Sequence, residues 1–443
     1  MKKFLVALLT LALCFAIVGC NPVDPTPTPS GSTTPTPSTG SGSPIVGLIC
    51  LHGQSSTYDK NFIDAFVAAC EAKGLSEDEY VIVVDIPEGQ ECYDEAVNMA
   101  EAGVKAIFAD SFGHESYMLQ AAEEYPDVTF CHATGTMAHT EELDNFHNAF
   151  AAIYEGRFLA GIAAGLKIAE MVEDGTIPAA EINNIHVGYV GAFPYEEVKS
   201  GYTSWFLGVR MGIMYSATPD TVSTMMGIFN TIQMDVEFTN SWYDQTLEYN
   251  AAAKLINEGC VLISQHADSM GAPSACEEAG VPNVAYNGST AAQCPETFIV
   301  SSRINWQPYF EKMIDVALTG DDNLPTDYVG TIADGSVVLT ALGEAAAEGT
   351  AEAIEYWTDM LALGFEVYDV SYFTVGGLAV TEYMANVDTD PGFEADTNVV
   401  KTKTIEIDGD EMSITYIAES FFRSAPYFGL DIDGINPRYP DAN

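Results

Sequence analysis

The segment Val261–Ser269, with the sequence VLISQHADS, ends an apolar run in polar side chains that could do chemistry. His266, Asp268 and Ser269 are costly to bury unless they are hydrogen-bonded or paired. Residues two apart on an extended strand share a face, so His266 and Asp268 could supply two ligands to a metal ion. The other histidines are scattered singly, and no second histidine cluster is present. We therefore expect no metal here and interpret the segment as a ligand clamp or a polar strand end.

Sequence signatures of catalysis and of phosphate binding are absent. The chain has no G-x-S-x-G elbow, no Walker A loop and no G-x-G-x-x-G fingerprint. Those turns present a serine nucleophile or hold phosphate groups. We expect no enzymatic activity and no cofactor. A metal-dependent surface hydrolase using His266 and Asp268 is a less favoured alternative, as is a surface structural or signalling receptor.

Apolar runs and helical repeats alternate from residue 45 onward, and these elements must position the polar groups. Runs such as GLIC, VIVV and AIFA are typical of strands buried on both faces of a parallel sheet. Segments with helical periodicity lie between them. The pattern restarts near residue 150, so we expect an α/β protein with two doubly wound parallel-sheet lobes.

Polar and aromatic residues follow the ends of these strands. In open parallel sheets the carboxyl ends of the strands meet at one edge, where ligands bind. Aromatic faces stack on a flat ring, and carboxylates, amides and hydroxyls bond to the edges of that ring. The candidate ligand-binding residues are Tyr58, Asp59, Phe112, Trp242, Asp244, His266, Asp268 and Asn287.

Each candidate also has a structural alternative. Asp59 and Asp244 each precede a helix and could cap it. Trp242 and Phe112 could pack between the lobes, and a single histidine such as His266 is more often structural. The recurrence of such residues at one sheet edge favours a binding site.

The chain is strongly acidic, with 64 Asp and Glu residues against 16 Lys and Arg residues. Such a surface repels DNA and RNA, so we expect no nucleic-acid partner. Beyond Cys20 the cysteines are odd in number and form no CxxC pair, so we expect no disulfide framework.

The N-terminus is typical of an exported, anchored protein. A basic start and an apolar stretch predict a signal peptide over residues 1–19. The stretch ends in IVGC, which resembles a bacterial lipobox, so we expect Cys20 to be lipidated; ordinary signal cleavage is the alternative. Residues 20–44 are rich in Pro, Thr, Ser and Gly, which predicts an extended tether. We expect a body held by the lipid at the extracytoplasmic face of the cell membrane.

Residues 45–365 resemble the basic membrane protein family, which are purine nucleoside receptor-like substrate-binding lipoproteins of ABC transporters. The most specific segments are WYDQTLEYNAAAKLINEG and ISQHADS, supported by VGYVGAFPYEEVKSGYTSWFLGVRMG. The resemblance implies the type I periplasmic binding protein fold, with a three-crossing hinge near residues 148–152, 286–289 and 323–330. It also implies a purine nucleoside or nucleobase as ligand, buried by lobe closure, and an ABC permease as partner.

The resemblance implies roles for the candidates of the first lobe and for one aromatic residue of the second. Tyr58 and Asp59 take the position of the loop that first meets the ligand. Phe112 takes the position of an aromatic residue near the base. Trp242 matches the stacking residue of the other lobe.

At the second lobe's strand end, the resemblance places His266 and Asp268. Asp268 is expected to pair with ribose hydroxyls or a base N–H. Asn287 stands where related sugar and nucleoside binders commonly have Asp, so a carboxylate clamp is not expected there. Trp306 either lines the cleft or packs beneath it.

The expected lobe 1 comprises residues 45–149 and 288–325, and the expected lobe 2 comprises residues 150–287 and 326–365. Residues 366–443 form a β-rich C-terminal extension with no assigned role. Within the same fold, a binder of another small polar solute such as a sugar is the alternative, because sugars also stack on Trp.

Overall fold

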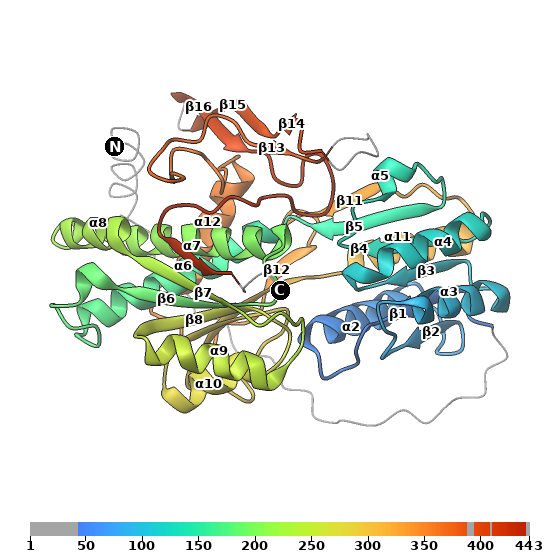
Figure 1. Ribbon diagram of the computed structural model, residues 1–443, viewed down its shortest axis with the longest axis horizontal. Coiled ribbons are helices and arrows are strands. Elements are labelled where there is room, and N and C mark those ends of the chain that lie inside the picture. Colours follow the sequence, from blue (N-terminus) through green and yellow to red (C-terminus); the bar gives the residue numbers. More distant parts are fainter. Residues whose placement is uncertain (1–42, 388–393, 408–409, 440–443) are drawn as a thin grey trace, which may run out of the picture. The chain divides into compact units, whose positions relative to one another are not determined.

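The computed structural model describes residues 43–387, 394–407 and 410–439 (Figure 1). The expected signal peptide, Cys20 and the tether up to residue 42 lie outside these residues. Within the described chain, no helix is both long and apolar enough to cross a membrane.

Lobe 1 is built on a six-stranded parallel sheet in the order β11-β5-β4-β3-β1-β2. Helices α2 and α11 cover one face of this sheet, and α3 and α4 cover the other. Because both faces are covered, all four residues of the AIFA strand are buried. The strands are β1 (Val46–Ile49), β2 (Tyr80–Val83), β3 (Ala106–Ala109), β4 (Thr129–Ala133), β5 (Phe146–Ala151) and β11 (Asp327–Gly330). The helices are α2 (Thr57–Ala72), α3 (Gln90–Ala102), η1 (Phe112–His114), α4 (Glu115–Glu124), α5 (Ala138–Glu141) and α11 (Gln307–Thr319).

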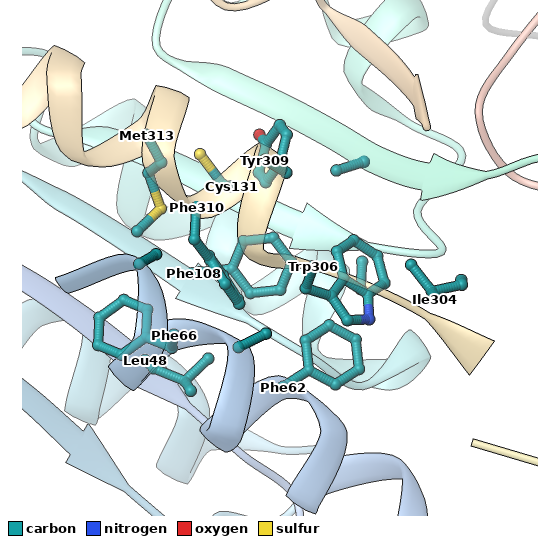
Figure 2. Packing of buried hydrophobic residues seen from close by; sticks show 14 of the residues in the cluster. Leu48, Phe62, Phe66, Phe108, Cys131, Ile304, Trp306, Tyr309, Phe310 and Met313 are labelled. Atoms are coloured by element: carbon teal, nitrogen blue, oxygen red, sulfur yellow. The ribbon is translucent and has the colours of Figure 1, made fainter. Parts of the chain in front are cut away.

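An aromatic cluster fills the core between the lobe 1 sheet, α2 and α11 (Figure 2). Trp306 stacks on Phe62 with ring centroids 4.4 Å apart, and Phe108 meets Phe310 edge-on at 5.0 Å. Trp306 is only 2% exposed. It therefore packs within this core and does not line the cleft.

Lobe 2 is built on a seven-stranded sheet in the order β12-β10-β9-β8-β6-β7-β17, in which only β12 runs antiparallel to its neighbour. Helices α6 and α7 lie over one face and α9 and α10 over the other (Figure 1). The strands are β6 (His186–Gly191), β7 (Gln233–Phe238), β8 (Cys260–His266), β9 (Asn283–Tyr286), β10 (Phe298–Ile304), β12 (Val337–Leu339) and β17 (Ile435–Arg438). The helices are α6 (Ile153–Glu173), η2 (Ile182–Asn184), α7 (Glu196–Tyr215), α8 (Val222–Thr231), α9 (Gln245–Asn257), α10 (Gly271–Ala279) and α12 (Thr350–Ala362). Two parallel-sheet lobes confirm the predicted α/β class.

Helices α6 and α7 touch backbone to backbone. A Cβ atom at Gly161 would lie 2.1 Å from the carbonyl oxygen of Trp205, and one at Gly208 would lie 2.1 Å from that of Phe158. Only glycine permits such an approach, so these glycines fix the spacing of the two helices that cover lobe 2.

Strands β10 and β11 each lie in the other lobe from the one expected from the sequence. The division assigns β10 to lobe 1, but β10 pairs with β9 of the lobe 2 sheet. It assigns β11 to lobe 2, but β11 pairs with β5 of the lobe 1 sheet. The chain was expected to cross between the lobes at the Asn-Gly turn after β9, but the next strand, β10, pairs with β9 in the same sheet. The crossings fall between β5 and α6, between β10 and α11, and between β11 and β12, and the expected crossing near residues 286–289 is wrong.

The C-terminal extension contains short strands in its described residues, as the sequence predicts. Strands β15 (Val400–Ile407) and β16 (Asp410–Ile417) form an antiparallel hairpin, and β13 (Met384–Ala385) pairs with β14 (Thr397–Asn398). Strand β17 adds to the edge of the lobe 2 sheet, parallel to β7, with Ile435 opposite Met234. The extension is therefore integrated with lobe 2.

Candidate functional site

A pocket lies where the carboxyl ends of the strands of both lobes meet. It encloses about 400 Å³ of empty space, a figure that includes space open to solvent. Six of its lining residues are candidates from the sequence: Tyr58, Asp59, Phe112, Trp242, His266 and Asp268. The others are Leu51, His52, Ser111, Thr134, Glu197 and Tyr286.

Asp59 forms part of the lobe 1 wall from the first turn of α2. Ser56 caps this helix, with its Oγ 3.2 Å from the Asp59 N–H; the capping alternative for Asp59 is therefore wrong. The Asp59 carboxylate accepts the backbone N–H of His52 at 2.6 Å and faces the His52 ring at 3.6 Å. Burial acts to raise the pKa of Asp59, but the hydrogen bonds from His52 and Ser56 outweigh it and lower the pKa. Asp59 is thus an ionised acceptor at the pocket wall.

Asp110 lies behind Asp59 and is fully buried. Its Oδ1 accepts the Leu51 N–H at 3.1 Å, and the Tyr58 hydroxyl donates to its backbone carbonyl at 2.7 Å. Burial, and then the charge of Asp59, raise the pKa of Asp110 well above its usual range. Two adjacent carboxyl groups that cannot both ionise share a proton, so Asp110 is the protonated member.

Ligand atoms of Cys50, Asp59 and Asp110 lie within 4.8 Å of one another. This spacing alone would suit a metal ion. Burial raises the pKa of the Cys50 thiol as well as that of Asp110, so both hold their protons and the group offers one ionised ligand. A metal ion bound here would have to displace both protons.

His266 forms part of the lobe 2 wall at the end of β8. Its Nε2 lies 3.3 Å from Oε1 of Glu197, and its ring centroid lies 4.8 Å from that of Tyr286. Burial, together with the positive charge of Arg157, lowers the pKa of His266 to about 4. The imidazole is therefore neutral near pH 7, and its Nε2–H donates to the Glu197 carboxylate.

Asp268 lies at the seam between the lobes. Its backbone carbonyl accepts both the N–H and the hydroxyl of Thr57 from lobe 1, at 3.0 and 3.1 Å. Its N–H donates to the carbonyl of Trp242 at 3.0 Å. Burial, followed by the nearby carboxylates led by Glu248, raises the pKa of its side chain well above the usual range. Asp268 therefore holds its proton more firmly than an exposed carboxyl group does.

Aromatic rings from both lobes stand at the pocket. Trp242 meets Phe193 edge-on at 5.1 Å, and Tyr195 of lobe 2 lies 6.0 Å from Phe112 of lobe 1. Phe112 and Tyr195 are each 44% exposed. Trp242 and Phe112 thus line the pocket; Phe112 also packs across the lobes against Tyr195, whereas Trp242 packs within lobe 2. Contact of either ring with a ligand stays a prediction.

Asp244 and Asn287 are not brought into the pocket lining. Asp244 caps α9 by accepting the N–H groups of Thr246 and Leu247, each at 2.9 Å. Asn287 is buried in a left-handed conformation, φ 63°, with its Nδ2 3.5 Å from Oδ1 of Asp268. Asp244 therefore acts as a helix cap, which was its structural alternative. Asn287 contacts a pocket residue, Asp268, without lining the pocket itself.

Two residues that the sequence reasoning did not select shape this wall. Glu197 lies one residue beyond the first position of α7, inside the helix that follows β6. Arg157 is 1% exposed, with its guanidinium carbon 3.3 Å from the centre of the Tyr286 ring and Nη1 donating to the Gln265 carbonyl at 2.9 Å. The sequence feature that could have identified Arg157 is its position as the single Arg within a long apolar helix.

Comparison with known proteins agrees with this geometry. A family model described as Bmp, ABC transporter substrate-binding protein PnrA-like, matches residues 72–332. The chain belongs to this Bmp family. Bmp proteins are ABC transporter substrate-binding proteins, which act outside the cytoplasm and work with a permease. Their family and fold are those of solute binders and not of enzymes.

Two relatives match about half of the chain. A purine-binding protein of Brucella abortus is 29% identical over 242 residues, covering 55% of this chain and 59% of the relative. A protein of Haloferax volcanii named as an ABC transporter glucose-binding protein is 31% identical over 234 residues, covering 53% of this chain and 50% of the relative. The chain therefore spans only about half to three-fifths of the length of these relatives.

A solved structure of an ABC transporter solute-binding protein from Conexibacter woesei is similar in fold. It superposes with a TM-score of 0.52 at 17% identity, covering 72% of this chain and 96% of the other. At this identity the likeness establishes the fold, and the expected type I periplasmic binding protein fold is confirmed.

Proposed function

We propose that this Bmp family member captures a purine nucleoside or nucleobase and delivers it to an ABC permease. The observation that carries the proposal is the composition of the pocket. Aromatic rings of both lobes, Phe112 and Trp242, stand beside the carboxyl groups of Asp59, Glu197 and Asp268. A purine offers a flat face for the rings, and base N–H groups or ribose hydroxyls for the carboxylates.

The charge of the pocket further restricts the ligand. Three lining residues carry carboxyl groups, and the buried cation Arg157 lies against the Tyr286 ring, outside the lining. A phosphorylated ligand would meet these carboxylates without a counter-charge, which is costly in a buried site. The proposal is therefore for an uncharged nucleoside or nucleobase and excludes nucleotides.

Closure would couple binding to transport. The hydrogen bonds from Thr57 to the Asp268 carbonyl join the lobes at the pocket. A ligand that contacts residues of both lobes stabilises the closed state by its difference in affinity for the two states. The residues that we propose to contact the ligand are Tyr58, Asp59, Phe112, Trp242, Glu197, His266 and Asp268.

We also propose that Cys20 carries the lipid that holds the protein at the extracytoplasmic membrane face. The support is the basic start, the apolar run and the IVGC ending of the leader. Intact mass measurement of the membrane-extracted protein tests this. A mass increase that is lost on Cys20→Ser supports it, and a processed chain with no acyl mass contradicts it.

A sugar is the second candidate ligand, favoured by the relative named as a glucose-binding protein. Carboxylates and a stacking Trp also suit a sugar ring. Mass spectrometry of ligand released from the freshly purified, denatured protein separates the two. A purine among the released molecules supports the proposal, and a sugar alone supports the second candidate.

A further inference from the structure

The C-terminal extension is fastened to lobe 2 at several points. Strand β17 pairs with β7, and the Tyr368 hydroxyl donates to the Ser200 carbonyl of α7 at 2.7 Å. The Lys199 ammonium, also on α7, donates to the Gly429 carbonyl at 3.2 Å and to Asp431 at 3.1 Å. These contacts make the extension a part of lobe 2.

The same extension also reaches lobe 1. The N–H and the hydroxyl of Ser424 both donate to Oδ1 of Asp327, at 2.9 and 2.7 Å. Ser424 is fully buried. Asp327 is the first residue of β11 in the lobe 1 sheet, and its other oxygen faces His139 of α5 at 3.2 Å. Hydrogen bonds to a carboxylate are about twice as strong as neutral ones, so this is a specific anchor.

Arg423 adds charge to the same place. Among nearby carboxylates, Glu419 of the extension acts on it most strongly, followed by Glu196 of lobe 2 and by Asp327 and Glu115 of lobe 1. Its guanidinium donates to the carbonyls of Asn386 and Pro426 within the extension. The charge of Arg423 is therefore balanced first within the extension and only in part by carboxylates of the two lobes.

The two sets of anchors are close in sequence. Ser424, bound to lobe 1, and Gly429, bound to lobe 2, are five positions apart in the sequence, with four residues between them. A fully extended chain spans at most about 3.6 Å per residue, so these anchors can separate by no more than roughly 18 Å. Phe428 between them is buried and stacks on Tyr368 at 4.3 Å, which leaves little slack.

We propose that residues 423–431 form an interlobe strap, which bridges the outside of the hinge, favours the closed arrangement and limits how far the lobes open. In this arrangement the Ser424–Asp327 anchor forms on closure and is lost on wide opening. The strap thereby sets the affinity for the transported solute without touching it. This inference does not rest on the identity of the ligand.

The test measures lobe separation directly. Spin labels on Glu91→Cys of α3 and Gln245→Cys of α9, both exposed, report the distance between the lobes in the ligand-free full chain. The native cysteines of the described chain are all buried, so the introduced ones react selectively. Ser424→Ala should shift the distances to longer values and broaden them. Asp327→Asn should do so less, because a neutral acceptor remains.

Thr374→Val is the matched control, because Thr374 donates to Asp433 within the extension and its hydroxyl does not anchor lobe 1. It should leave the distances as in the parent. Titration with adenosine should show about tenfold weaker binding for Ser424→Ala. If adenosine does not bind the parent protein, the proposed function is contradicted, but the spin-label distances still test whether the strap limits lobe opening. Identical distances in the parent, Ser424→Ala and Asp327→Asn would overturn the strap, as would an equal shift in Thr374→Val.

Discussion

The Nε2 atom of His266 lies 3.3 Å from Oε1 of Glu197, so a neutral imidazole orients a carboxylate at the pocket wall. Donation to one oxygen of Glu197 leaves the other available to a hydrogen-bond donor on the ligand. His266 thereby positions the Glu197 carboxylate in addition to lining the pocket itself.

Replacing Glu197 by Gln should weaken ligand binding. The side chain keeps its shape but loses its charge, and hydrogen bonds to charged groups contribute about 1.5–3 kcal/mol against about 1 kcal/mol for neutral ones. We expect adenosine affinity to fall roughly tenfold in calorimetric titration. Asp244→Asn is the control, because Asp244 caps α9 outside the pocket and Asn also caps well. Equal affinities for the parent and Glu197→Gln would contradict the role of Glu197.

Replacing Trp242 by Ala should remove a stacking face. We expect about tenfold or greater loss of purine affinity, since a base stacked on an aromatic ring contributes about 1–3 kcal/mol. The quenching of intrinsic fluorescence by the ligand should also decrease. Phe421→Ala serves as a control, because Phe421 is 69% exposed on the extension. Undiminished affinity in Trp242→Ala would exclude stacking on this residue.

The pH dependence of stability should reveal the buried neutral state of His266. Its folded pKa of about 4 lies below the ordinary value of 6.5, so the unfolded chain binds the extra proton first as the pH falls. Its contribution to stability is therefore present above pH 6.5 and is lost between pH 6.5 and pH 4. His266→Gln should show a smaller decrease in unfolding free energy over this range, by up to about 3 kcal/mol. Parallel curves for the two proteins would indicate a His266 pKa near 6.5.

The contact between α6 and α7 offers a test of the packing. Gly208→Ala should destabilise the protein by about 3 kcal/mol or more, because the new Cβ would overlap the Phe158 carbonyl. Gly227→Ala in α8 is the control, since its nearest neighbour is 3.8 Å away, and Ala is the better helix former by roughly 1 kcal/mol. Thermal unfolding should give a lower melting temperature for Gly208→Ala than for the parent protein, and an equal or higher one for Gly227→Ala.

Much of the architecture followed from local pattern, because strands buried on both faces must be apolar throughout and helices must carry one apolar face. Local sequence pattern did not predict which sheet β10 and β11 join, because long-range packing determines which strands pair. In the site, His266 could be predicted because it ends an apolar run directly, and Asp59 because it lies in the polar stretch that follows the first apolar run. Arg157 and Glu197 were missed because they lie inside helices, and their pocket roles arise only when α6 and α7 pack against β8 and β9.

The central claim is tested most directly by equilibrium titration of the ligand-stripped protein with adenosine, adenine, ribose and glucose under one set of conditions. The account predicts that adenosine or adenine binds at least about a hundredfold more tightly than either sugar, with Trp242→Ala reducing that preference. Tight binding of glucose with no measurable binding of either purine would contradict it.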